Sequence, residues 1–423
     1  SLASIMSQPV HAAGSDELKI ALIGCGNRGA GAAAQALSTA GPVKLWALAD
    51  AFDDRLQTCL RAVKREIVDT LGEDQAAKRI AVPRDRRFVG LDAYRKAIDV
   101  ADVVLLCEPP GFRPKHFEYA VNAGKHVFME KPVATDAVGI RRVLAAGQAA
   151  KEKGLKVSVG LQRRHQPCYH EAIERIHDGE IGDVTGMRCY WNGSAPAKSP
   201  FPRGDLSELE FQVRNWYFFT WLSGDHICEQ HVHNIDVCNW IKQAYPVQAQ
   251  GLGGRQVRTG KEYGNIFDHH DVEFTYVDGT KMFSQCRQIP GCWNQVAEAA
   301  QGTLGRAELN ANGSQIFLNG KSVWRSPRER KNRAAYQTEH DVLFDAIRND
   351  KPHNETEYAA RSTMTAILGR MATYSGRIVS WDEAFNSPVS FTTDAEDWAA
   401  KAPVAPDSEG WYAIAKPGST SVV

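Results

Sequence analysis

Three groups of residues have types and spacings suited to chemistry. The first is the run Gly24-Cys25-Gly26-Asn27-Arg28-Gly29, which follows the apolar stretch 18–23 and precedes a stretch of small residues at 30–37. Glycines at these places allow a tight turn after a strand and let a pyrophosphate approach the start of a helix, where negative charge is favoured. Asp50 ends the next apolar run, and an acidic residue there accepts the hydroxyls of a ribose. Together the run and Asp50 predict a dinucleotide site rather than a purely structural turn.

The type of dinucleotide follows from the charge at Asp50. A carboxylate at this position binds both ribose hydroxyls of NAD and repels the 2′-phosphate of NADP. Arg28 and Arg55 lie near enough in the sequence to keep NADP open as the less favoured alternative. NAD is therefore the expected cofactor.

The second group is Glu130-Lys131-Pro132, which follows the apolar run 126–129. If this run is a strand of a parallel sheet, the tripeptide lies at the carboxyl edge, where doubly wound sheets bind their ligands. A lysine at this edge can reach a reacting hydroxyl and lower its pKa. The alternative is a surface lysine in a turn shaped by Pro132.

The third group is the run Glu229-Gln230-His231-Val232-His233-Asn234-Ile235-Asp236. On one helix from about 226 to 242, residues 229, 233 and 236 share a face and His231 points away. An imidazole held by a carboxylate is the usual general base, because its pKa lies close to the operating pH. The alternative is the polar face of a buried helix. Metal binding by Glu229, His231 and His233 is disfavoured because histidines two residues apart on a helix diverge, so no metal is expected.

The predicted helices and strands must bring these three groups of residues together. Up to residue 159 short apolar runs alternate with helical segments, which predicts a parallel sheet with right-handed crossovers in an α/β domain at 17–159. After residue 160, alternating apolar and polar runs joined by turns such as Asp278-Gly279 predict an antiparallel sheet in an α+β domain at 160–380. The segment 192–225 and the tail 381–423 are expected to be irregular.

Composition narrows the class of protein. The chain has 423 residues, 43% of them hydrophobic and 24% charged, which is typical of a globular protein with two cores. Its 50 Lys and Arg balance 50 Asp and Glu, so a nucleic-acid partner is not expected. No run approaches the roughly 20 apolar residues that span a membrane. Nine irregularly spaced cysteines without a CxxC pair indicate free thiols rather than a disulfide framework.

The first residues suggest a location. Residues 1–16 carry little charge and place small residues around Val10-His11-Ala12-Ala13, as the end of an export signal does. The alternative is a disordered extension. We therefore expect an exported, periplasmic protein, with a cytoplasmic location as the alternative.

Five motifs in order resemble the glucose-fructose oxidoreductase / inositol dehydrogenase family (Gfo/Idh/MocA oxidoreductases). They are the glycine run 24–29, the run 123–132 that ends in Glu130-Lys131-Pro132, Val159-Gly160-Leu161-Gln162-Arg163-Arg164, His233-Asn234-Ile235-Asp236 and Gly302-Thr303-Leu304-Gly305-Arg306-Ala307. The resemblance implies an α/β Rossmann domain followed by an α+β domain with a large, mostly antiparallel open sheet. In the family this sheet often forms a subunit interface, so a homodimer or homotetramer is expected.

The resemblance also assigns roles. Lys131 would assist the proton of the reacting hydroxyl and His233 would be the general acid/base. Many members have aspartate where this chain has Glu229, which leaves the partner of His233 open, although Glu229 is kept among the expected catalytic residues. The expected substrate contacts are Lys131, Arg164, Trp191, His233 and Asp236. The expected cofactor contacts are Gly24, Gly26, Asn27, Arg28, Gly29, Asp50, Glu108, Pro109, His116, Glu130, Lys131, Gln162, Arg164 and Trp216.

The segment from Tyr190 to Asp225 departs from common members of the family. Its aromatic rings could stack on sugars and its Arg and Asn side chains could bind hydroxyls, which suggests a carbohydrate lid. The alternative is an insertion packed as a second layer or a subunit contact. The residues concerned are Trp191, Asn192, Arg203, Arg214, Asn215, Trp216, Tyr217 and Trp221.

Three functions remain open at this level. The first is an NAD-dependent dehydrogenase of a sugar, polyol or glycoside. The second is an enzyme that keeps NAD bound and recycles it, either between two sugars or in glycoside cleavage through a keto-sugar. The third is a non-catalytic binding protein, which the presence of both Lys131 and His233 disfavours.

Overall fold

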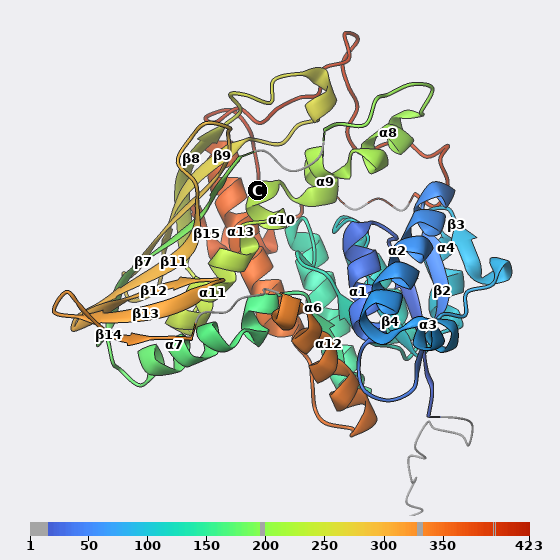
Figure 1. Cartoon of the computed structure of the whole chain (residues 1–423). Coiled ribbons are helices and arrows are strands. Elements are labelled where there is room, and N and C mark those ends of the chain that lie inside the picture. Colours follow the sequence, from blue (N-terminus) through green and yellow to red (C-terminus); the bar gives the residue numbers. More distant parts are fainter. Residues whose placement is uncertain (1–15, 195–198, 328–332, 392, 394) are drawn as a thin grey trace, which may run out of the picture.

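The computed structural model describes residues 16–194, 199–327, 333–391, 393 and 395–423 (Figure 1). The expected export segment lies outside the described residues except for Asp16. Among the described residues no helix is both long and apolar enough to cross a membrane. All nine cysteines are described and all are free thiols, as predicted.

The N-terminal domain is built on a six-stranded parallel sheet. Its strands run in the spatial order β3-β2-β1-β4-β5-β6. Strand β4 reads Val-Val-Leu-Leu and is buried throughout, as expected when helices cover both faces of a parallel sheet. The strand order reverses between β1 and β4, so the loops after these strands diverge and open a crevice. The strands are β1 (Leu18–Ile23), β2 (Val43–Asp50), β3 (Arg87–Val89), β4 (Val103–Leu106), β5 (His126–Met129) and β6 (Val157–Val159).

Helices lie between these strands along the chain. They are α1 (Asn27–Leu37), α2 (Asp53–Leu71), α3 (Glu73–Arg79), η1 (Arg84–Arg86), α4 (Ala93–Asp99), α5 (Arg113–Asn122) and α6 (Ala137–Glu152). The predicted α/β architecture is confirmed.

The C-terminal part contains a nine-stranded sheet in the order β14-β13-β12-β11-β7-β10-β9-β8-β15. All neighbours are antiparallel except β7 and β10, which confirms the large, mostly antiparallel sheet. Helices α7 (Pro167–His177), α11 (Val232–Lys242) and α13 (Thr356–Ser375) pack against one face, between the sheet and the N-terminal domain (Figure 1). The strands are β7 (Val184–Gly193), β8 (Gln248–Gly254), β9 (His269–Thr275), β10 (Lys281–Gln288), β11 (Gln295–Gly302), β12 (Gly305–Asn310), β13 (Gly313–Leu318), β14 (Lys321–Arg325) and β15 (Val379–Ser380).

The single helix expected at 226–242 is wrong. The structure has α10 (His226–Glu229) and then α11, with Gln230 and His231 between them. The N–H of His231 bonds to the carbonyl of His226, five residues back, instead of the carbonyl four residues back. This shift of register changes the direction in which the residues after Glu229 point.

Two segments predicted to be irregular contain short helices. Residues 192–225 include α8 (Glu208–Arg214), η3 (Trp216–Phe218) and α9 (Thr220–Ser223), and the tail begins with α14 (Trp381–Asn386). Helices α8 and α14 each begin with a capping box, formed by a serine and a glutamate three residues later. Helices of this length depend on tertiary packing, which a sequence pattern does not show.

Three further helices are η2 (Gln162–His165), η4 (Lys261–Tyr263) and α12 (Arg333–Arg348). Helix α12 contacts α1, and its Leu343, Phe344 and Ile347 are buried in the core beside the N-terminal sheet. The N-terminal core therefore includes residues that lie far beyond residue 159 in the sequence.

Candidate active site

One cavity of about 470 Å³ opens at the carboxyl edge of the parallel sheet, and α10 and α11 close its far side. Residues of the three groups that sequence spacing singled out meet there, although Gly24 and His233 lie more than 200 positions apart. The predicted residues that line it are Gly24, Gly26, Asn27, Arg28, Gly29, Asp50, Glu108, Pro109, His116, Glu130, Lys131, Gln162, Trp191, Trp216, Glu229 and His233.

The glycine turn has the shape that a dinucleotide needs. Gly24 has φ +88°, and a Cβ there would lie 2.3 Å from the backbone nitrogen of Glu108. A Cβ at Gly29 would lie 2.0 Å from the carbonyl oxygen of Gly24, so this position allows the helix to pack on the strand. A Cβ at Gly26 would meet no atom within 4 Å, so Gly26 faces open space at the start of α1. The first and third glycines therefore serve packing, and the second leaves room for a pyrophosphate.

Asp50 is held at the end of β2 by the glycine turn. Its Oδ2 accepts the N–H of Cys25 at 2.7 Å, and its Oδ1 accepts the N–H of Phe52 at 2.9 Å. Burial raises the pKa of Asp50, and the two backbone hydrogen bonds oppose this shift. Each oxygen keeps a lone pair for a further donor. A ribose diol would supply two such donors.

Several polar atoms buried in the cavity wall have no hydrogen-bond partner among the described residues. They include both carboxylate oxygens of Glu108 and the Oε1 of Gln162. The ring of His116 stacks on Tyr94 with centroids 3.9 Å apart, and its Nδ1 lies 3.3 Å from Oε1 of Glu108. Buried polar atoms normally have partners, so this wall fits a ligand rich in hydrogen-bonding groups, as NAD is.

The guanidinium of Arg28 bonds to three other side chains. Its Nε pairs with Glu130, its second amino group donates to Glu339 at 2.8 Å, and its first donates to Gln35 at 2.7 Å. Burial acts to raise the pKa of Glu130, but the charges of Arg28 and Lys131 lower it. Arg28 thus serves to keep Glu130 charged beside Lys131.

Lys131 and Glu229 form a pair across the cavity. The Nζ of Lys131 lies 3.2 Å from Oε1 of Glu229 and also donates to the backbone carbonyl of that residue. The pair joins the Rossmann sheet edge to the end of α10. Glu229 therefore holds Lys131. Among the described residues, no hydrogen bond links Glu229 to His233.

His233 presents a neutral imidazole to the cavity. Burial lowers the pKa of His233 well below its ordinary value, and the charges of Lys131 and Arg163 lower it further. His233 lines the cavity, and its Nδ1 is buried without a hydrogen-bond partner among the described residues. Trp191 stacks on the imidazole with centroids 6.0 Å apart. A neutral imidazole is the form that accepts a proton.

Two predicted substrate contacts lie outside the cavity. The guanidinium of Arg164 makes two 2.9 Å hydrogen bonds to the carboxylate of Asp236, which also accepts the hydroxyl of Ser362 at 2.7 Å. Asp236 is buried. The register shift after Glu229 places this ion pair behind the wall that carries His233.

Some side chains of the segment 190–225 line the cavity, as a carbohydrate lid would, and others pack in the core, as an inserted second layer would. Trp191, Arg214 and Trp216 line the cavity. Arg214 also makes two hydrogen bonds to Asp54, at 2.8 and 3.0 Å, and so joins α8 to the start of α2. The remaining aromatic and amide side chains, Asn192, Asn215, Tyr217 and Trp221, are buried in the core.

Gln230 lines the cavity and was not predicted. The Nε2 of Gln288 donates to Oε1 of Gln230 at 2.7 Å and to the hydroxyl of Tyr217 at 2.6 Å, while Arg258 donates to Oε1 of Gln288. Arginine only donates, so the amide of Gln288 has one orientation and Gln230 must accept through Oε1. The amino group of Gln230 is left as a donor to the cavity. Its place beside Glu229 was the one signal in the sequence.

Residues 18–161 match the model of a family described as "Oxidoreductase family, NAD-binding Rossmann fold" (GFO_IDH_MocA). Inositol 2-dehydrogenase 3 of Saccharopolyspora erythraea is 28% identical over 182 residues, which is 43% of this chain and 46% of that protein. Inositol 2-dehydrogenase of Klebsiella pneumoniae strain 342 is 34% identical over 125 residues, 29% of this chain and 36% of that protein. The chain spans less than half the length of these relatives.

Solved structures show the same fold over most of the chain. Scyllo-inositol dehydrogenase from Lactobacillus casei, with bound cofactor NAD(H) and scyllo-inositol, has a TM-score of 0.62 at 19% identity and covers 87% of this chain and 100% of that one. Aldose-aldose oxidoreductase from Caulobacter crescentus, complexed with glycerol, has a TM-score of 0.65 at 18% identity and covers 86% of this chain and 99% of that one. At these identities the likeness concerns the fold.

Proposed function

From the match of residues 18–161 to the model of the Gfo/Idh/MocA oxidoreductases with an NAD-binding Rossmann fold, we propose that the protein oxidises or reduces a carbinol carbon of a sugar, polyol or glycoside with NAD. One observation carries the proposal. Lys131 and the neutral imidazole of His233 line the same cavity as the glycine turn and Asp50. A proton-transfer pair and a dinucleotide cradle in one cavity are what such a reaction requires.

The chain would hold NAD along the carboxyl edge of the parallel sheet. The open face of Gly26 at the start of α1 would receive the pyrophosphate, and Asp50 the ribose hydroxyls. The unpartnered atoms of Glu108 and Gln162 would bind further polar groups of the cofactor. Bound NAD supplies the hydride acceptor. Asp50 favours NAD over NADP because its charge opposes a 2′-phosphate.

The proton of the reacting hydroxyl would pass to His233. Burial keeps this imidazole neutral, so it is ready to accept a proton. The ammonium group of Lys131, held by Glu229, stabilises negative charge on the substrate oxygen. In the reverse direction the same two groups return the proton to a carbonyl oxygen.

The substrate class follows from the groups around this pair. Trp191 offers an aromatic face, which suits the apolar side of a sugar ring, and Gln230 offers an amide donor for a substrate oxygen. The names of the relatives, inositol and aldose oxidoreductases, point to the same class of polyhydroxylated substrate. A neutral sugar or cyclitol suits the balanced charge of the chain better than a uronic acid.

The second candidate function is an enzyme that catalyses the same hydride and proton transfer but keeps NAD bound between turnovers. The C-terminal tail packs outside the cavity wall near Asp50, where Trp398 stacks on Phe52 with ring centroids 5.1 Å apart. Glu396 of the tail pairs with Arg95 and Lys115 of the N-terminal domain. A wall braced in this way favours slow release of NAD. Such an enzyme would pass hydride between two sugars or cleave a glycoside through a keto-sugar.

The experiment that tests both candidates is an analysis of the cofactor in purified protein. The protein is denatured, the released nucleotide is identified by absorbance and mass, and the measurement is repeated after incubation with sugars, cyclitols and glycosides. An empty site that binds added NAD and releases NADH during turnover supports the exchanging dehydrogenase. Stoichiometric NAD that is reduced in place supports the closed cycle.

A variant of the tail separates the two candidates further. Trp398→Ala removes the ring that braces Phe52, and the control Trp411→Ala removes an exposed ring elsewhere in the tail. Faster loss of NAD from the first variant alone supports retention by the tail. Protein that neither contains nor binds NAD would overturn both candidates.

Assembly and location complete the proposal. The face of the nine-stranded sheet opposite its helices exposes Leu252 and Phe283, and Trp293 is exposed in the connection between β10 and β11, which suits a homodimer or homotetramer formed through this sheet. Light scattering on the intact protein, with Phe283→Glu as the variant, tests this assembly. Export to the periplasm, expected from the first residues, is tested by fractionating cells that produce the full-length protein.

A further inference from the structure

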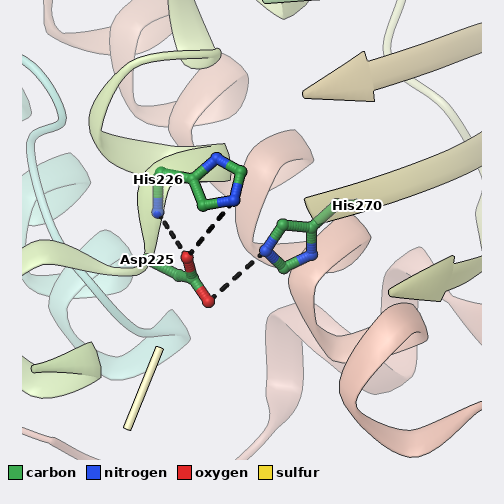
Figure 2. A group of neighbouring side chains, drawn as sticks. All are labelled: Asp225, His226 and His270. Atoms are coloured by element: carbon green, nitrogen blue, oxygen red, sulfur yellow. Dashed lines mark hydrogen bonds and ion pairs between the residues drawn. The ribbon is translucent and has the colours of Figure 1, made fainter. Parts of the chain in front are cut away.

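A second group of side chains with ligand chemistry lies outside the cavity. Asp225, His226 and His270 converge where the start of α10, the start of β9 and the end of α13 meet (Figure 2). One ligand atom from each lies within 4.8 Å of the other two. All three residues are at most 2% exposed. The dinucleotide site and the proton-transfer pair use none of them.

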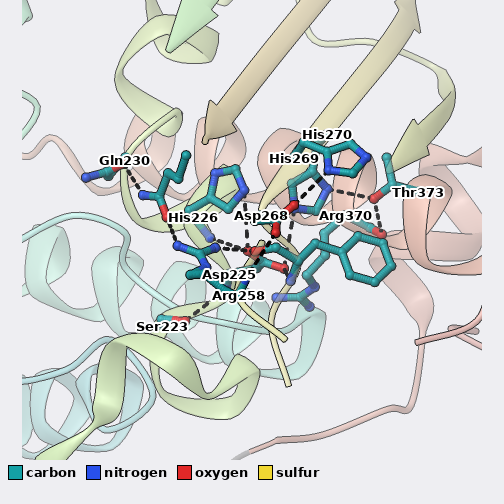
Figure 3. A network of polar contacts seen from close by, with 12 residues as sticks. Ser223, Asp225, His226, Gln230, Arg258, Asp268, His269, His270, Arg370 and Thr373 are labelled. Carbon is teal, nitrogen blue, oxygen red and sulfur yellow. Dashed lines mark hydrogen bonds and ion pairs between the residues drawn. The ribbon is translucent and has the colours of Figure 1, made fainter. Parts of the chain in front are cut away.

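The tautomer of His270 follows from its neighbour Thr373 (Figure 3). The hydroxyl of Thr373 donates to the carbonyl of Arg370 at 3.0 Å, so its oxygen can only accept from the Nδ1 of His270, which lies 2.9 Å away. A neutral His270 therefore carries its proton on Nδ1 and a lone pair on Nε2. This Nε2 lies 3.3 Å from Oδ2 of Asp225 but makes no hydrogen bond. A cation at this place would satisfy the lone pairs of both atoms.

His226 directs a second lone nitrogen at the same carboxylate. Its Nε2 is buried without a hydrogen-bond partner among the described residues and lies 4.0 Å from Oδ1 of Asp225. An unpartnered buried nitrogen is costly unless a ligand occupies it.

The remaining contacts of Asp225 hold its carboxylate in place. Oδ2 accepts the N–H of Phe267 at 2.8 Å and the hydroxyl of Tyr374 at 2.6 Å, and Oδ1 accepts the N–H of His226. Asp225 has φ +70°, a backbone conformation that a residue with a side chain rarely adopts. Outer hydrogen bonds of this kind, including that of Thr373 to His270, orient the ligands in metal sites. Strained residues also gather at functional sites.

The spacing and the charges suit a small divalent ion. Donor atoms about 2.0–2.1 Å from a tetrahedral ion lie roughly 3.3 Å apart. The Nε2 of His270 lies 3.3 Å from Oδ2 of Asp225, the Nε2 of His226 lies 4.0 Å from Oδ1, and all ligand atoms lie within 4.8 Å of one another, so a shared ion requires the cluster to contract. Two arginines lie near the cluster, and each directs its guanidinium to a backbone carbonyl: Arg258 to Phe267 and Arg370 to Gly224. Asp268, buried beside Arg258, balances part of this charge.

We propose that Asp225, His226 and His270 bind one divalent transition-metal ion of the zinc class, with two imidazole nitrogens and one carboxylate oxygen as ligands. Nitrogen and oxygen donors of these types select such ions over magnesium or calcium. The ion fastens the start of α10 to β9, and the other end of α10 carries Glu229. The site is structural and lies apart from the reacting atoms, so it does not depend on the proposed reaction.

The test is the metal content of the untagged protein. Inductively coupled plasma mass spectrometry on purified wild-type protein, as isolated and after incubation with Zn²⁺ or Co²⁺ and desalting, should find about one ion per chain. Bound Co²⁺ should give visible absorption bands, which report nitrogen and oxygen ligands. Addition of the chelator dipicolinate should lower the thermal unfolding midpoint.

Variants locate the ion. His226→Gln and His270→Gln should each lose most of it, whereas the control His269→Gln should retain it, because the side chain of His269 is 38% exposed and bonds to Asp268 instead. Retention of the ion in both cluster variants would place it elsewhere and overturn the proposal. If the cluster variants do not fold, the wild-type measurement decides. Wild-type protein that takes up no ion from Zn²⁺, Co²⁺, Fe²⁺ or Ni²⁺ overturns the proposal.

Discussion

The ammonium group of Lys131 lies 3.2 Å from the carboxylate of Glu229 and donates to the backbone carbonyl of the same residue. The two residues are 98 positions apart in the sequence. Lys131 follows strand β5 of the parallel sheet, and Glu229 is the last residue of helix α10. The carboxylate that helical spacing assigned to the histidine therefore serves the lysine. His233 is left with the neutral ring that a base needs.

The pair makes Glu229 a positioning residue. Glu229→Gln keeps the shape of the side chain but removes the charge that holds Lys131, so we expect kcat to fall about tenfold or more while the Kd for NAD is unchanged. Steady-state kinetics and NAD titration measure the two quantities. Glu229→Asp, which keeps the charge on a shorter arm, should recover part of the loss. A wild-type kcat in Glu229→Gln would mean that the charge of Glu229 does not position Lys131.

Lys131 is proposed to act on the substrate oxygen and not to bind NAD. Lys131→Met should therefore lower kcat by roughly 10²–10⁴-fold and leave bound NAD in place. Single-turnover reduction of NAD, followed by absorbance, measures the loss directly. Lys153→Met, on α6's C-terminal side away from the cavity, is the matched control. Near-normal turnover in Lys131→Met would remove Lys131 from the mechanism.

His233 should make the folded protein sensitive to acid. Burial lowers its folded pKa, and Lys131, Arg163, Arg28 and His231 lower it further, so below pH 6.5 the unfolded chain binds a proton that the folded chain does not. The contribution is fully present above about pH 6.5 and is lost as the pH falls, by at most about 1.4 kcal/mol per pH unit.

Urea unfolding of wild-type protein and His233→Asn at about pH 7.5 and about pH 5.5 measures this contribution. The wild-type protein should lose about 1 kcal/mol more than the variant between the two conditions. Other buried histidines titrate in both proteins and cancel in the difference. Identical losses would show that His233 is charged when folded, which contradicts its role as a base.

Asp50 is proposed to select between the two dinucleotides. Asp50→Ala should raise the Kd for NAD about tenfold or more and raise that for NADP less, because the repulsion of the 2′-phosphate is lost together with the ribose contact. Fluorescence titration with NADH and NADPH gives both constants. Asp50→Asn keeps an acceptor for the N–H of Cys25 and is the control for the glycine turn. Equal weakening of both dinucleotides would mean that Asp50 only supports the turn.

Local patterns in the sequence determined much of this protein. Alternation of buried runs and helical segments predicted the parallel sheet, because strands covered on both faces must be apolar throughout. Runs in which apolar and polar residues alternate predicted the antiparallel sheet, because only one face of such a strand packs against a core. The glycine run, Asp50, Lys131 and His233 were found because each follows a strand or belongs to a motif, and the structure places all of them in one cavity.

Tertiary packing decided the rest. The break between α10 and α11, which turns Asp236 away from the cavity towards Arg164, comes from one shifted backbone hydrogen bond that no side-chain period records. The convergence of Asp225, His226 and His270 joins residues 45 positions apart, and the orientation of Gln230 depends on Arg258 through Gln288. These arrangements are set by contacts distant in the chain, whereas sequence periodicity reports only which side of its own element a residue occupies.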